Sequence, residues 1–159
     1  MKRAITVVAP LGAVVLLIVA VSAWAAPSER RGGDRHPGRT FTVIEHATTD
    51  ATTDTGAAGD SAGDILTFAN DLFDAADTAK VGTDQGYCVR TVAGSAYECT
   101  WTTFLAGGQI VVSGPFYDAR PSTMAITGGT GRFRGARGSM DLEARENGTK
   151  FAFTFHVKR

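Results

Sequence analysis

Residues 85–105 read QGYCVRTVAGSAYECTWTTFL and hold both cysteines of the chain. A turn at Ala93-Gly94 would fold this stretch into a hairpin in which Cys88 lies directly opposite Cys99. Opposed residues of an antiparallel pair share one face of the sheet, with Cβ atoms about 4.5 to 5.5 Å apart, and a disulfide needs a similar separation. The sequence therefore predicts a hairpin closed by a Cys88–Cys99 disulfide.

The N-terminus indicates a compartment in which such a disulfide forms. The basic start, Met1-Lys2-Arg3, precedes an apolar run at residues 5–21, and Ala23-Trp24-Ala25 places small residues where a signal peptidase cuts. We expect a signal peptide over residues 1–25 and a secreted protein, either extracellular or in the cell envelope. The apolar run also approaches the about 20 residues of a membrane-spanning helix, so a retained anchor is the alternative.

The charge balance argues against one large class of partners. The chain carries 16 basic and 16 acidic residues, so its formal net charge is zero and no whole-protein field attracts nucleic acid or anionic lipid. After cleavage of the signal we expect no stable insertion into a membrane. Residues 26–39 are rich in Gly and Arg and lack apolar periodicity, which indicates a flexible leader. Residues 40–159 remain for one folded domain.

From Thr40 onward apolar and polar residues alternate with a period of two, which is typical of a β-strand. Phe41, Val43 and Glu45 share one face of this strand. If that face is the interior, burial disfavours the charged carboxylate and raises the pKa of Glu45. If the register runs the other way, Glu45 faces water. The sequence leaves both orientations open.

Residues 47–63 contain no large apolar residue, and we expect a mobile loop there. The loop carries Asp50, Asp54 and Asp60, whose spacing lacks the alternating D-x-D ligands and the closing glutamate of a calcium loop. We therefore predict no metal site.

Two segments on either side of the cysteine hairpin also indicate strands. Residues 64–73, DILTFANDLF, alternate as a strand that enters a turn at residues 71–77. A turn at Gly107-Gly108 would pair Trp101 with Gly114, where the missing side chain leaves room for the indole. We expect the strand beyond this turn to end or bulge at the following proline, because proline cannot donate to the ladder.

The C-terminal part of the chain contains a hairpin and a glycine-rich corner. Asn147-Gly148 is the preferred dipeptide of a type I′ turn, and it would set Leu142 opposite Phe153. Residues 128–138, GGTGRFRGARG, lack the G-K-[ST] of a phosphate loop and precede a strand, so we predict a structural corner. About eight short strands with hairpin signals are typical of an antiparallel sandwich or a closed barrel.

Several stretches resemble the allene oxide cyclase barrel family in their order and spacing, and the closing KFAFTFHVK is similar to its last strand. They are GDILTFAN (63–70), KVGTDQGYCV (80–89), YECTWTTF (97–104), SGPFYD (113–118) and AITGGTGRFRGARG (125–138). The glycine-rich corner also occurs in plant dirigent proteins, which share the barrel. The resemblance implies an all-β, eight-stranded antiparallel up-and-down barrel with an apolar interior pocket, in a bacterial-type secreted member. The family is commonly trimeric, so a homotrimer is the implied assembly.

The resemblance also implies which residues form the pocket. By motif, the ligand-binding positions are Leu66, Phe68, Asn70, Cys88, Tyr97 and Phe116. The catalytic glutamate of the cyclases lies in a Y-E-I-N-E strand where this chain reads T-V-I-E-H, and Glu45 matches it once the register is moved. The Ser-Pro pair that helps the cyclases to hold a bound water has no counterpart in residues 47–63.

Two functions are compatible with these residues, and neither requires a cofactor. In the first, the protein is an isomerase whose apolar wall folds a small apolar molecule, while Asn70 and Glu45 stabilise the charge that develops during its cyclisation or isomerisation. In the second, the same pocket serves a non-catalytic ligand-binding protein of the cell envelope, or the barrel is structural. The sequence leaves the choice open.

Overall fold

The structure of the protein, a computed structural model, describes residues 38–158; the predicted signal peptide at 1–25 and most of the predicted leader lie outside this part. The strands are β1 (Arg39–His46), β2 (Ala51–Thr53), β3 (Ile65–Phe68), β4 (Asp71–Phe73), β5 (Lys80–Val92), β6 (Ala96–Leu105), β7 (Gly108–Tyr117), β8 (Ser122–Gly129), β9 (Arg137–Arg145) and β10 (Lys150–Lys158). Two short 3₁₀ turns are η1 (Gly131–Phe133) and η2 (Glu146–Gly148). Within residues 38–158, no helix has the length and apolar character needed to cross a membrane.

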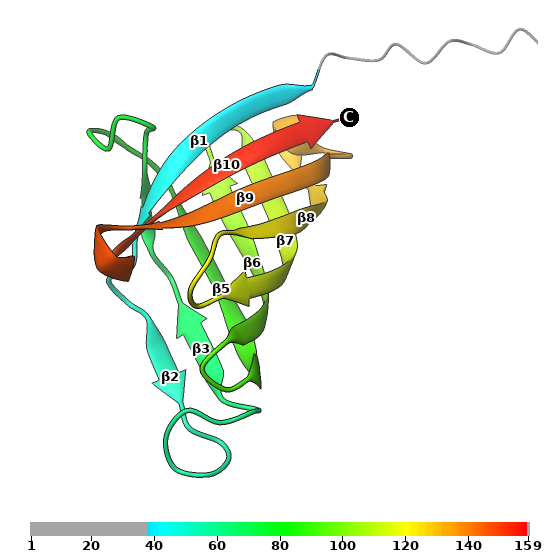
Figure 1. Cartoon of the computed structure of the whole chain (residues 1–159). Helices are drawn as coiled ribbons and strands as arrows, with labels where there is room; N and C mark the ends of the chain where they lie inside the picture. Colours follow the sequence, from blue (N-terminus) through cyan, green and yellow to red (C-terminus); the bar gives the residue numbers. More distant parts are fainter. Residues whose placement is uncertain (1–37, 159) are drawn as a thin grey trace, which may run out of the picture. The chain divides into compact units, whose positions relative to one another are not determined.

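The strands close into one antiparallel barrel (Figure 1). Their order is β2-β3-β5-β4-β1-β10-β9-β8-β7-β6, and the additional pairing of β5 with β6 closes the ring. Strands β3 and β4 pair in succession with β5, so together they form one interrupted strand. The barrel therefore has eight strand positions, with β2 added outside β3, and the predicted eight-stranded antiparallel barrel is confirmed.

The β5–β6 hairpin confirms the predicted disulfide. Cys88 lies opposite Cys99, and the two residues form a disulfide on the buried inner face of the barrel. The predicted pairing continues as far as Arg90 opposite Tyr97. Beyond this pair the partner of Val92 is displaced by one residue from the predicted one, because β5 carries an extra residue at its end.

The β6–β7 hairpin differs from the prediction by two residues. The strands turn before Gly108 rather than at Gly107-Gly108, so Trp101 lies opposite Val112. Gly107 supplies the positive φ of the turn (+87°), whereas Gly108 already belongs to β7 and packs against the corner, where an added Cβ would lie 2.2 Å from the Thr130 oxygen. A shift of two residues leaves every side chain on its predicted face.

Strand β7 also continues past Pro115, contrary to the expected end or bulge, and runs to Tyr117. Its pairing with β8 stops at Ser113, so the proline has no partner strand on that side. On the other side Pro115 lies opposite Glu98 of β6. The missing N–H therefore costs no ladder bond toward β8.

The β9–β10 hairpin matches its prediction. Leu142 lies opposite Phe153, and Asn147 has φ 57° and ψ 34° while Gly148 has φ 82°, as a type I′ turn requires. This register places the phenylalanines of β10 on the inner face. Figure 1 shows β10 between β1 and β9.

The segments around β2 to β4 were predicted less well. Residues 47–63 are not loop throughout, because Ala51–Thr53 pair with β3 through their backbone although their side chains are exposed. The strand that begins at Ile65 does not turn at residue 71 but resumes as β4, because Leu72 is fully buried between β1 and β5. The turn follows, where the Asp74 N–H donates to the Ala79 carbonyl.

The barrel is filled at one end. The corner at residues 128–138 is structural, as predicted, and η1 within it buries Phe133 against Phe41, with ring centroids 6.3 Å apart. Phe41 in turn stacks on Phe155 at 5.1 Å. The cavity described next begins beyond this plug, at the level of Phe153.

Candidate functional site

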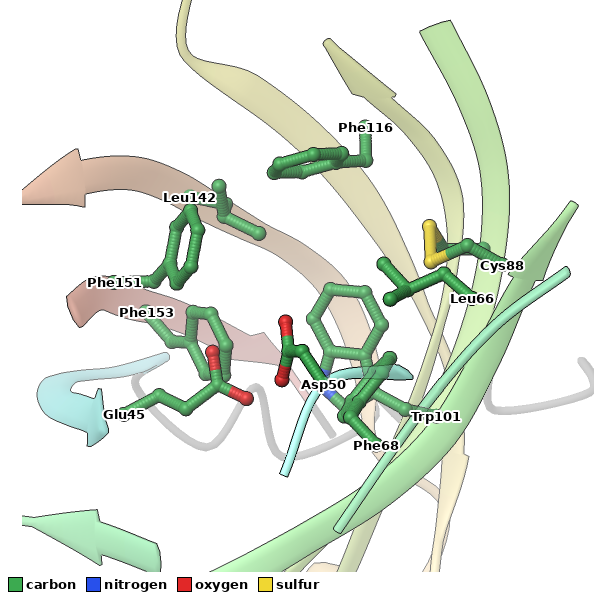
Figure 2. A pocket seen from close by; sticks show the side chains of 11 residues that line it. Glu45, Asp50, Leu66, Phe68, Cys88, Trp101, Phe116, Leu142, Phe151 and Phe153 are labelled. Carbon is green, nitrogen blue, oxygen red and sulfur yellow. A yellow bond between two sulfur atoms is a disulfide. The ribbon is translucent and has the colours of Figure 1, made fainter. Parts of the chain in front are cut away.

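An inner cavity of about 40 Å³ opens into a wider mouth of about 800 Å³. Asp50, Leu66, Phe116, Leu142 and Phe151 line both, so they form the neck between the two spaces. The inner cavity has room for roughly three water molecules. Its lining consists of Glu45, Asp50, Leu66, Phe68, Cys88, Cys99, Trp101, Phe116, Leu142, Phe151 and Phe153 (Figure 2).

Glu45 points into the barrel. Strand β1 lies between β4 and β10, so Glu45 has Leu72 opposite it on one side and Phe151 on the other. Its side chain is 5% exposed and lines the inner cavity. The orientation that the sequence left open is therefore inward, and the catalytic role predicted for Glu45 stays a prediction.

Asn70 uses its whole amide group to hold Glu45 and the following loop. Its Nδ2 donates to Glu45 Oε1 at 2.9 Å and to Asp50 Oδ1 at 2.8 Å. Its Oδ1 accepts from the backbone N–H groups of Thr48 and Thr49, both at 3.0 Å, and from the Thr49 hydroxyl at 2.9 Å. Asn70 itself is 1% exposed. It therefore fixes both carboxyl groups of the cavity relative to each other.

A second buried acid, Asp84 of β5, lies behind Glu45. Its side chain is 1% exposed, and if both acids were ionised its Oδ2 would have no hydrogen-bond donor. A proton on Glu45 supplies that donor, and the two carboxyl groups then share a hydrogen bond. Burial, reinforced by repulsion from Asp84, raises the pKa of Glu45 to about 9, and burial raises the pKa of Asp84 to about 7. Glu45 is thus protonated at neutral pH.

Aromatic rings form most of the remaining wall. Trp101 packs edge-on against Phe68, with centroids 5.8 Å apart, and tilted against Phe153 at 5.4 Å. Phe116 and Phe151 meet edge-to-face at 5.8 Å at the neck. Aromatic rings favour such arrangements, so these pairs stabilise an apolar wall.

Trp101 is placed by a glycine on the neighbouring strand. It lies opposite Gly86, where an added Cβ would come within 2.3 Å of the Trp101 Cβ. The indole is 4% exposed, and its Nε1 has no hydrogen-bond partner among the described residues. An unpaired buried N–H is costly, which makes this group a candidate donor to a ligand.

The mouth carries a charged cluster on its rim. The Arg90 guanidinium lies 3.6 Å from the Tyr97 ring centroid and donates through Nη1 to both carboxylate oxygens of Asp118, at 2.8 and 2.7 Å. Its Nε lies 2.7 Å from Asp60 Oδ1 on the loop that precedes β3. The cluster therefore joins the loop to the barrel rim.

The residues predicted by motif fall into three places. Leu66, Phe68, Cys88 and Phe116 line the inner cavity, Tyr97 lines the mouth, and Asn70 lies behind the wall as the residue that holds the carboxyl groups. Their ligand-binding role stays a prediction.

Sequence reasoning missed Asp84, Trp101, Phe151 and Phe153 as site residues, and it considered Asp50 only as a metal ligand. A usable signal for Asp84 was its position on β5, because Asp84 lies an even number of positions away from Cys88 and Arg90 and is therefore on the same face of the strand. For Asp50 there was no such signal, because its position depends on the Asn70 hydrogen bond.

The arrangement permits proton transfer at an apolar surface. Glu45 and Asp50 both line the pocket and are held by the same Asn70 nitrogen, so the pocket can donate a proton to one atom of a ligand and accept one from another. No group of three or more His, Cys, Asp or Glu side chains within residues 38–158 is arranged to hold a metal ion.

Comparison with known proteins places the chain among barrels of one kind. The family model described as allene oxide cyclase matches residues 43–159. A pyocyanin demethylase is similar in structure, with 29% sequence identity, a TM-score of 0.64 and coverage of 72% of this chain and 98% of that one.

More distant structures share the fold. A pterocarpan synthase dirigent protein has 18% identity, a TM-score of 0.60 and coverage of 79% of this chain and 99% of its own. A Diels-Alderase from Streptomyces koyangensis has 17% identity, a TM-score of 0.62 and coverage of 77% and 63% respectively.

Proposed function

Since the chain belongs to the allene oxide cyclase family, we propose that its barrel binds a small, flat, largely apolar molecule and catalyses a cofactor-free isomerisation or cyclisation of it. The observation that carries the proposal is the buried Glu45 carboxyl group, held by Asn70, in the wall of an aromatic cavity. Charge-stabilising groups are most effective where water is excluded and where they need no reorganisation.

The proposed mechanism is a proton transfer within the pocket. Glu45 donates the proton that it shares with Asp84 to an oxygen or nitrogen of the ligand, and the Asn70 Nδ2–H that donates to Glu45 Oε1 stabilises the carboxylate that remains. Asp50 at the neck accepts a proton from another atom of the ligand and releases it to solvent, while Glu45 takes up a proton from solvent. One proton enters and one leaves, so the product is an isomer of the substrate and no electrons are exchanged.

The aromatic wall contributes by holding one conformation of the ligand. Trp101 packs against both Phe68 and Phe153, so a flat molecule meets side chains that are already packed rather than ones that must first be ordered. The inner cavity admits only one edge or substituent, and the rest of the molecule occupies the mouth. Ring closure in such a pocket yields one stereoisomer.

The similarity to the pyocyanin demethylase supports a nitrogen-containing, ring-fused aromatic ligand. Pyocyanin is therefore the probe of binding, and an unsaturated epoxide that cyclises spontaneously is the probe of turnover. The full chain is incubated with the epoxide, and products are analysed by chiral chromatography with mass spectrometry. We expect turnover of the epoxide, and we expect the Glu45→Gln variant to be slower by about 10²-fold or more, as loss of a general acid predicts.

Glu98→Gln is the matched control, because Glu98 is exposed on β6 outside the cavity and the change makes the same Glu-to-Gln replacement there. Racemic product from the epoxide at the uncatalysed rate, at high protein concentration, would overturn the catalytic proposal. Tight binding without turnover would instead support the alternative, a ligand carrier.

We further propose that the protein acts outside the cytoplasm, which the disulfide on the inner face and the N-terminal sequence support. Fractionation of cells that express the full chain, followed by thiol alkylation, tests this. Two free thiols in a cytoplasmic fraction would contradict it.

A homotrimer is the assembly that we propose from the family resemblance. Val81 and Tyr87 on the outer face of β5 are 37% and 51% exposed, and large exposed apolar side chains favour burial by a second copy. Light scattering on the purified protein tests this, and a monomer mass at micromolar concentration would refute it.

A further inference from the structure

The inner cavity combines aromatic rings with carboxyl groups and has no basic side chain among its lining residues. Glu45 and Asp50 are its acids, and Asp84 adds a third carboxyl group behind Glu45. The arginines of the mouth are already engaged: Arg90 is paired with two aspartates, and Arg120 stacks on the Tyr117 ring at 3.5 Å on the exposed rim. The pocket therefore lacks a positive charge to match its carboxyl groups.

We propose that the ligand is a flat aromatic cation with a hydrogen-bond acceptor at its inner edge, and that Asp50 sets the preference for positive charge. This inference rests on the proposed function, since it names the ligand class of the same pocket. It concerns affinity and charge, and it can fail while the pocket still binds neutral molecules.

The neck is where the positive charge fits. Asp50 lines both the inner cavity and the mouth, and only its Oδ1 has a hydrogen-bond partner among the described residues, namely Asn70 Nδ2. Phe116 and Phe151 line the same two spaces. A cation at this level meets a carboxylate oxygen and two aromatic side chains, which is the combination that recognises quaternary and aromatic ammonium groups.

The inner cavity also offers an unused hydrogen-bond donor. The Trp101 Nε1–H has no partner among the described residues, and Trp101 lines the inner cavity. A ring nitrogen or a carbonyl oxygen on the inner edge of the ligand would pair with it and remove the cost of the unpaired indole N–H. Figure 2 shows Glu45, Asp50 and Trp101 around the same space. The ligand therefore carries its acceptor inward and its positive charge toward the mouth.

Three probes with one ring system but different charge test the inference: N-methylphenazinium (cation), phenazine (neutral) and phenazine-1-carboxylate (anion). Their binding to the full chain is measured by isothermal titration calorimetry at neutral pH. We expect the cation to bind most tightly and the anion most weakly. Asp50→Asn keeps the oxygen that accepts from Asn70, and we expect it to weaken the cation by about fivefold to tenfold while phenazine is unchanged, because one carboxylate partner is lost at a partly solvated site. Glu98→Gln, with the same change of charge outside the cavity, should alter none of the three affinities.

The outcomes separate the two proposals. If phenazine and its N-methyl cation bind equally well and Asp50→Asn changes neither, the charge inference is wrong and the pocket proposal stands. Preference for the anion also overturns the inference. If none of the three probes binds, the proposed ligand pocket itself fails.

Discussion

Replacing Glu45 by Gln should remove most of the alkaline instability of the barrel. Gln has nearly the same shape, its Oε1 can still accept from Asn70, and its amide can donate to Asp84, so the packing is retained. What changes is the ionisation. In the folded protein the pKa of Glu45 is about 9 against 4.5 for the free side chain, because the group is buried. Between these pH values the folded state keeps a proton that the unfolded state releases.

The sign and size of the effect follow from this difference in protons bound. A raised pKa contributes stability that is complete below about pH 4.5 and is lost as the pH rises through about 9. In this window the free energy of unfolding falls by about 1.4 kcal/mol per pH unit for one proton. From about pH 7 to about pH 8.5 the wild-type protein should therefore lose about 2 kcal/mol through Glu45. Glu45→Gln should lose none of it.

Urea denaturation at both pH values, followed by tryptophan fluorescence, measures the two slopes. Glu98→Gln provides the control for a surface carboxylate, and its slope should equal that of the wild type. If Glu45→Gln keeps the wild-type slope, Glu45 is already ionised at neutral pH, and the proposed acid is absent.

Further predictions concern the disulfide, the hydrogen bonds of Asn70 and the close contact between Gly86 and the facing tryptophan. Replacing Cys88 and Cys99 together by Ala should lower the free energy of unfolding by about 3 kcal/mol, the value expected for a short closed loop, as measured by urea denaturation against the disulfide-bonded wild type. Asn70→Ala removes five hydrogen bonds of one side chain, so the rate of amide hydrogen exchange at residues 48–50 should rise to that of an open loop. Unchanged protection of these amides would contradict the role of Asn70 in holding the loop. Gly86→Ala would bring a Cβ within 2.3 Å of the facing tryptophan and should abolish folding, whereas at Gly128 an added Cβ has nothing within 4 Å and Ala should leave the melting temperature nearly unchanged.

Local patterns predicted the hairpins, which make most of the barrel contacts, whereas the choice of a closed barrel over a sandwich came from the family resemblance. Cys88 opposite Cys99, and Leu142 opposite Phe153, follow from turn positions and a period of two, and both pairings occur. The β6–β7 turn was misplaced because two adjacent glycines fit the same turn, and the choice depends on a contact of Gly108 with the distant corner. Sequence spacing carries no information on such a contact.

The candidate site was harder to predict because its polar centre is assembled from separate strands. Alternation placed Phe41, Val43 and Glu45 on one face but could not say which face is the interior. The answer comes from Asn70, which lies in the break between β3 and β4 and reaches Glu45 of β1. Asp84 on β5 completes the pair, and the link between these residues exists only in the closed barrel.

The central claim is that Glu45 is a neutral acid inside the pocket at physiological pH. A titration of its side-chain carboxyl carbon by ¹³C NMR, with the resonance assigned by its absence in Glu45→Gln, tests this most directly. We predict that the resonance is that of a protonated acid at neutral pH and shifts to the carboxylate position near pH 9. A midpoint near 4.5, the ordinary value of a solvated glutamate, would contradict the account.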